Sequence, residues 1–162
     1  MKREYEYVGP AEIGKMASAP IDRLQPQSAD NIRDWLADGE HELTYVVDSQ
    51  GRLWLSDRRT EHVACAQGAR VQGAGELVLE VSAQGVAVVS VTNQSTGYCP
   101  EASCWDAVRP ALVNAGLCPP TELTHSFEFR RCPQCGGINL LKLEMPECGE
   151  YGSDLPAHWN FA

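Results

Sequence analysis

Three of the seven cysteines of this 162-residue chain lie close together near its end, at positions 132, 135 and 148. The segment Cys132-Pro133-Gln134-Cys135-Gly136-Gly137 places two thiols two residues apart and follows them with glycine. This pattern is typical of a zinc knuckle, in which backbone N–H groups point at the sulfurs and glycine accepts a positive φ. A short predicted strand and then Cys148-Gly149 follow. The sequence therefore predicts a zinc ribbon in which Cys132, Cys135 and Cys148 bind a structural zinc ion.

The fourth zinc ligand is left open by the sequence. A complete ribbon carries a ligand at position 151, where this chain has Tyr151, and the other candidates are His158 and Cys118. Two alternatives compete with zinc binding: a ribbon that has lost its metal but kept its packing, and a redox-active Cys pair. The redox interpretation lacks the helix that follows a thioredoxin-like Cys-x-x-Cys.

The loop Asn93–Pro100 is a second candidate site, because it lies between a predicted strand and a predicted helix. Ser95, Thr96 and Tyr98 supply hydroxyl groups. Cys99 precedes the helix start, where free N–H groups favour an anion or lower the pKa of a thiol. The loop is either a ligand pocket, a nucleophile site built on Cys99, or a capping loop whose cysteine and tyrosine pack inward.

A charged run, Asp57–Cys65, contributes His62 and Arg58. His62 could act as a base, bind metal together with Cys65, or form part of the packed structure. Arg58 could bind an anionic ligand or form surface ion pairs. The following segment, Gln67–Glu76, is rich in glycine and alanine, which indicates close backbone packing; it lacks the glycine order of a phosphate-binding loop.

The overall charge excludes several classes of function. Thirteen Lys and Arg against 22 Asp and Glu give a net charge of −9. Binding to nucleic acid is therefore not expected, nor is docking on an acidic membrane surface, because both depend on clustered Lys and Arg. We find no apolar run long enough to cross a membrane and no signal peptide. An odd number of cysteines also argues against a disulfide framework, so we expect a cytoplasmic protein.

The elements that would position these residues indicate an α+β fold. We expect a mixed or mainly antiparallel sheet, two or three helices, and a C-terminal zinc-ribbon-like hairpin. The apolar run 86–91 indicates a central strand covered on both faces. Residues 1–123 would form the main domain, and 124–162 the hairpin with a tail that docks on it. The predicted strands are 5–8, 43–47, 52–55, 76–81, 86–91, 124–130 and 138–143, and the predicted helices are 11–17, 31–37 and 101–115. Strands 43–47 and 52–55 would form a hairpin through the turn Asp48–Gly51, and strands 76–81 and 86–91 a second hairpin. Ser28 and Asp30 are candidate caps of the helix 31–37, and residues 20–26 would form a loop.

Several segments resemble a group of small uncharacterised bacterial proteins. They are Glu61–Ala66, Ala74–Glu76, Asn93–Pro100, the Cys-x-x-Cys ribbon, and Leu155-Pro156 with Trp159-Asn160. Together they extend over most of the chain, from about residue 5 to residue 161. The members of this group have a fourth ribbon cysteine at the position of Tyr151. The resemblance implies no particular activity.

A more distant similarity links residues 43–116 to plant IQ-motif calmodulin-binding proteins and to some toxin-associated bacterial domains. His62 and Ala74-Gly75 match, as do Ser95, Tyr98 and Pro100, but the chain has no IQ motif. The similarity implies a shared core in which His62 and Tyr98 lie near each other; calmodulin binding does not carry over.

The leading hypothesis is a non-catalytic module that recognises a small ligand or a partner protein. Its site would contain Arg58, His62, Ser95, Thr96 and Tyr98. The start of the predicted helix at residue 101 would also belong to it. One alternative is a transferase or hydrolase with Cys99 as nucleophile and His62 as base, including an ADP-ribosyl-transfer variant in which His62 and Tyr98 flank nicotinamide. Another is an accessory protein of a bacterial toxin or defence system.

Overall fold

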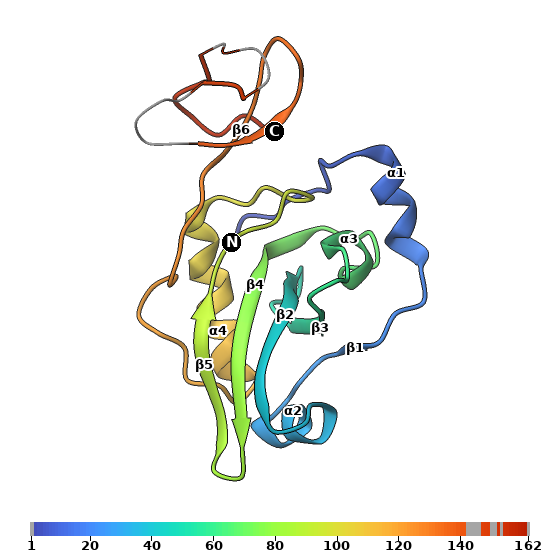
Figure 1. Ribbon diagram of the computed structural model, residues 1–162, viewed down its shortest axis with the longest axis vertical. Helices are drawn as coiled ribbons and strands as arrows, with labels where there is room; N and C mark the ends of the chain where they lie inside the picture. The colour runs from blue at the N-terminus through green and yellow to red at the C-terminus, as the bar shows by residue number, and fades with distance from the viewer. Residues whose placement is uncertain (1, 142–146, 150–151, 153, 162) are drawn as a thin grey trace.

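The sheet is built around β2 (Gly39–Asp48), whose residues 43–47 are all buried. A computed structural model describes residues 2–141, 147–149, 152 and 154–161 of the chain. In it, β2 pairs antiparallel with β3 (Leu53–Asp57) on one side and with β4 (Val71–Ser82) on the other. The strand order is β1-β3-β2-β4-β5, with β1 (Arg23–Leu24) and β5 (Gly85–Val91) at the edges (Figure 1). The predicted α+β class with a mainly antiparallel sheet is confirmed.

Both predicted hairpins are present, but the predicted place of the second strand of the second hairpin is wrong. The apolar run 86–91 indicated a central strand, whereas β5 lies at the edge of the sheet. The pairing of β4 with β5 shifts register opposite Val89, whose side chain is 47% exposed. The β-branched residues of β5 suit a half-buried edge strand as well as a fully buried central strand. An apolar run by itself therefore does not reveal whether a strand is central.

The helix α4 (Trp105–Asn114), preceded by a short 3-10 turn at Ala102–Cys104, packs on the sheet and buries one apolar face. Pro110 lies inside this helix, where its missing N–H leaves the carbonyl of Asp106 without a helical donor. The Lys2 ammonium group donates to that carbonyl instead. The carbonyl that loses its helical donor at the proline is thus still hydrogen-bonded, to the N-terminal segment.

The other helices are short. α1 (Ala11–Gly14) continues into a 3-10 turn at Lys15–Ser18, and α2 (Ala29–Trp35) begins at the predicted cap Ser28, whose Oγ accepts from the Asn31 N–H. α3 (His62–Cys65) is a single turn that the sequence analysis missed. None of the helices in the described residues has the length and apolar character needed to cross a membrane.

The C-terminal unit comprises residues 124–161 as far as they are described. Its first residues run beside the end of β5, where the Thr124 N–H donates to the Val91 carbonyl, and the part with β6 (Phe129–Arg131) lies beyond one end of the sheet (Figure 1). β6 pairs antiparallel with β7 (Ile138–Leu140), so both strands are shorter than predicted in the described residues. The predicted strand 138–143 extends into residues 142–143, which lie outside them. Trp159 of the tail packs against the main core, and the division of the chain at residue 123 stays a prediction.

Candidate functional site

The three clustered cysteines of the sequence meet in space. The Sγ atoms of Cys132, Cys135 and Cys148 all lie within 4.8 Å of one another. The distance from the Cys135 sulfur to the Cys148 sulfur is 3.7 Å. Cys132 and Cys148 are buried and Cys135 is half-buried. Three thiols this close together could bind a metal ion.

Two similar turns present these sulfurs. The Gly136 N–H donates to the Cys132 carbonyl at 2.8 Å, and the Gly152 N–H donates to the Cys148 carbonyl at the same distance. Both glycines have positive φ, +73° and +64°. The sulfurs also accept N–H groups, since the Gly137 N–H lies 3.3 Å from the Cys135 sulfur. Backbone and side-chain geometry therefore suit thiolates that bind metal.

Two of the residues predicted as a fourth ligand, His158 and Cys118, are described by the structure, and neither lies with the three cysteines. The group of mutually close ligand atoms among the described residues contains neither His158 nor Cys118. His158 lies instead on the wall of a pocket, and Cys118 is exposed after the end of α4. Tyr151, which stands where a complete ribbon has its fourth cysteine, lies outside the described residues.

The hydroxyl groups of the loop 93–100 mostly form internal hydrogen bonds. Ser95 and Tyr98 are 1% and 0% exposed. The Ser95 Oγ accepts from the Tyr98 N–H, and the Tyr98 hydroxyl donates to the Ala69 carbonyl at 2.8 Å. Burial raises the pKa of Tyr98. Of the three predicted hydroxyl groups, only that of Thr96 belongs to an exposed residue.

Cys99 is a buried thiol in a constrained backbone position. Its φ is +46°, its sulfur donates to the Thr96 carbonyl at 3.4 Å, and its own carbonyl accepts from the Trp159 indole N–H at 2.6 Å. Burial raises the pKa of Cys99 to about 12, in spite of the opposing effect of the nearby Arg131 charge. The thiol is therefore protonated at neutral pH, which does not suit a nucleophile.

His62 and Arg58 have partners away from that loop. The His62 Nε2 lies 2.8 Å from the Gly75 carbonyl and so carries the proton of this hydrogen bond, which ties α3 to β4. Burial lowers the pKa of His62, so the ring is neutral at physiological pH. Arg58 is exposed and pairs with Glu42 at 2.8 Å. His62 and Tyr98 thus bond to different carbonyls, and the predicted joint site of these residues stays a prediction.

Labelling with iodoacetamide tests the state of the cysteines. At about pH 8, the exposed Cys118 will react quickly, whereas Cys99 will stay unlabelled because a buried thiol with a pKa of about 12 carries almost no thiolate. Mass spectrometry of the digested protein measures both rates in one sample. Labelling of Cys99 as fast as Cys118 would contradict this assignment.

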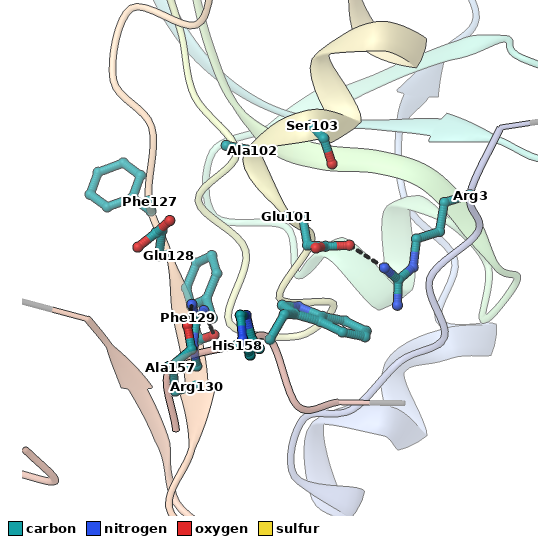
Figure 2. A pocket seen from close by; sticks show the side chains of 11 residues that line it. Arg3, Glu101, Ala102, Ser103, Phe127, Glu128, Phe129, Arg130, Ala157 and His158 are labelled. Atoms are coloured by element: carbon teal, nitrogen blue, oxygen red, sulfur yellow. Dashed lines mark hydrogen bonds and ion pairs between the residues drawn. The ribbon is translucent and has the colours of Figure 1, made fainter. Parts of the chain in front are cut away.

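A pocket of about 490 Å³ lies between the main domain and the C-terminal unit. Figure 2 shows residues 127–130 on one wall, Glu101 facing Arg3 on another, and His158 near the bottom of the view. Four segments that are remote in sequence line it: Arg3, Glu101–Ser103, 127–130 and 157–159. The predicted involvement of the helix start at 101 agrees with this lining, but the pocket is lined by none of the predicted ligand-binding side chains.

The pocket carries charges of both signs. Arg130 is only 6% exposed and donates to the carbonyls of Phe129, Pro156 and Ala157, with no carboxylate ion pair among the described residues. The Glu101 carboxylate accepts from Arg3, whose guanidinium lies 4.3 Å from the Trp159 ring centroid.

Aromatic side chains of residues 127, 129 and 159 supply apolar surface between these charges. The arrangement suits a ligand of mixed charge with an apolar part. No local pattern in the sequence marks Arg3 or Arg130 as site residues, because their segments meet only in the tertiary structure.

The chain matches no model of a known protein family, no curated protein and no solved structure. The family resemblances of the sequence therefore remain expectations. Only the geometry of the site can indicate the function.

Proposed function

We propose that this protein is a non-catalytic cytoplasmic binding module in which a zinc ion stabilises one wall of a ligand pocket. The observation that carries the proposal is the composition of the pocket, whose walls come from both the main domain and the C-terminal unit. The same C-terminal unit contains Cys132, Cys135 and Cys148. A metal ion that holds this unit together would therefore also hold the pocket in shape.

Zinc is the metal that best fits the donor set. Clustered cysteine thiolates, turns that close with glycine, and N–H groups directed at sulfur are typical of structural zinc sites. Zinc bound there would link the turn of Cys132 to the turn of Cys148 and add its binding free energy to folding. The zinc-ribbon assignment is part of this proposal.

A binding role is favoured over catalysis by the state of the two candidate reactive groups. The Cys99 thiol is buried and protonated, and the His62 ring bonds to a backbone carbonyl. The pocket, in contrast, offers the side chains of Arg3, Glu101 and Glu128 beside aromatic rings. It would recognise a small ligand, or a short segment of a partner protein, that carries both charges.

A library of short peptides, each with one aromatic residue between Lys and Glu, tests this proposal by NMR titration. Binding peptides will shift the amide resonances of Ala102, Arg130 and His158 in a saturable way. Ser103→Trp will weaken this binding by about tenfold or more, because the indole fills a pocket that Ser103 lines.

The matched control is Ser18→Trp, an exposed serine that does not line the pocket and whose replacement will leave binding unchanged. The proposed pocket is wrong if Ser103→Trp binds the peptides as tightly as the unaltered chain, or if the shifted resonances lie elsewhere.

A further inference from the structure

A second pocket, of about 270 Å³, lies where the turn between β2 and β3 meets residues 66–71. It shares no lining residue with the pocket of the proposed function. We propose that this second pocket binds a small ligand through an oxyanion group, a phosphate or a carboxylate, with Arg23 as the central binding residue.

The charge of the pocket differs in sign from that of the whole chain. Its titratable lining side chains are Arg23, Arg52, Arg70 and Asp48, in a protein whose net charge is −9. Arg70 also pairs with Glu6, outside the lining. A local excess of arginine in an acidic protein is the arrangement expected where an anion must be held against the general repulsion.

The single carboxylate that lines the pocket, that of Asp48, already accepts four hydrogen bonds. Asp48 accepts from the backbone N–H groups of Gln50 and Arg52 at 2.9 and 3.0 Å, from the Arg52 Nε at 2.8 Å and from the Trp54 indole at 2.9 Å. Burial alone would raise the pKa of Asp48, but these hydrogen bonds outweigh it and lower the pKa. Asp48 is therefore ionised and directed at its own turn, which leaves it little capacity to neutralise Arg23.

Arg23 is held in a fixed orientation without a carboxylate partner. Its guanidinium carbon lies 3.9 Å from the centroid of the Trp54 ring, and one N–H donates to the Cys65 carbonyl at 3.0 Å. The ion pairs of the described part of the chain do not include it. A guanidinium has five N–H donors, so donors beyond the bond to Cys65 can bind an oxyanion in the geometry that arginine favours.

The position of Trp54 is itself fixed, because its indole N–H is bound to Asp48. The stack of Arg23 on Trp54 thus rests on the β2–β3 turn, and binding an anion would require little reordering of the guanidinium. Such preorganisation improves affinity by lowering the entropy that binding costs. The modest volume suits a small metabolite rather than a protein segment.

An NMR titration with inorganic phosphate at neutral pH and constant ionic strength tests this inference. The Trp54 indole resonance and the amides of residues 67–70 will shift in a saturable way. Arg23→Gln will weaken binding by about tenfold or more, because charge-assisted hydrogen bonds are lost. Arg33→Gln, which removes a charge from an exposed position on α2, is the matched control and will leave binding unchanged.

Parallel titrations with acetate distinguish the two possible sources of the oxyanion. Saturation by phosphate alone assigns a phosphorylated ligand, and saturation by acetate alone assigns a carboxylate. Should Arg23→Gln fail to fold, Arg70→Gln gives a second measurement, with an expected loss of about threefold because Arg70 is exposed. The inference is overturned if neither anion gives saturable shifts, or if Arg23→Gln or its substitute binds like Arg33→Gln. These outcomes are independent of the peptide titrations, since the two pockets share no residue.

Discussion

Replacing Gly75 with alanine will strongly destabilise the folded state. A Cβ atom at this position would lie 1.9 Å from the carbonyl oxygen of Thr92 and 2.7 Å from its carbonyl carbon. That carbonyl cannot easily move, because it accepts from the buried Tyr45 hydroxyl at 2.7 Å and the Thr92 N–H donates to Glu76. We expect a loss of more than about 4 kcal/mol in the free energy of unfolding, measured by urea denaturation and soluble yield.

Gly73→Ala is the matched control, two residues away on the same strand. Its Cβ would lie 2.5 Å from a terminal methyl group of Val108, a side-chain atom of α4 rather than a backbone carbonyl held by hydrogen bonds. The expected cost is roughly 1–3 kcal/mol, the usual cost of overpacking a core. A Gly75→Ala protein that unfolds at the same urea concentration as Gly73→Ala would show that the close approach of β4 to Thr92 is not essential.

If zinc is bound as we propose, removing it will unfold the C-terminal unit while the main sheet remains intact. Among the described residues of this unit the buried cluster is small: Cys132, Cys148 and Leu155, with Cys135 and Leu141 packed against them. A cluster of this size contributes little apolar burial to folding. Zinc bound by thiolates contributes about 10–16 kcal/mol to the folding of small zinc-finger peptides, so its loss outweighs the remaining contacts. A chelator, or Cys148→Ser, will therefore collapse the amide dispersion of residues 129–141 while residues 39–91 keep theirs.

Cys118→Ser provides the control for this result, because Cys118 is exposed and lies outside the cysteine cluster. Native mass spectrometry will find one zinc ion per chain in the unaltered protein and in Cys118→Ser, and none in Cys148→Ser. A C-terminal unit that keeps its amide dispersion in the presence of chelator would contradict the structural role of the metal.

The features that the sequence predicted correctly depend on neighbouring residues. The turn Asp48–Gly51 between β2 and β3 and the Ser28 cap of α2 each follow from local backbone chemistry, and the structure contains them. The close packing expected of the glycine-rich segment is also present, since Gly75 lies directly against Thr92. The cysteine cluster belongs to this class too, because the Cys-x-x-Cys spacing already specifies the turn that holds two of its sulfurs.

Only the tertiary structure decided which polar and apolar groups are accessible. The run 86–91 is as apolar as a central strand, yet β5 is an edge strand, because strand order depends on pairing between distant segments. Cys99 lies near a helix start, yet burial raises the pKa of its thiol, and its carbonyl accepts from the Trp159 indole of the distant tail.

The two pockets illustrate the same distinction. Arg3, Glu101 and Arg130 are separated by long stretches of sequence and become neighbours only when the C-terminal unit docks. Arg23 lies in a segment predicted as a loop and becomes a binding candidate only by stacking on Trp54. Residue type and spacing therefore determined the local turns and the cysteines that could bind a metal ion in this protein. Long-range packing determined burial, and with it the charge state of each group and the surfaces open to ligands.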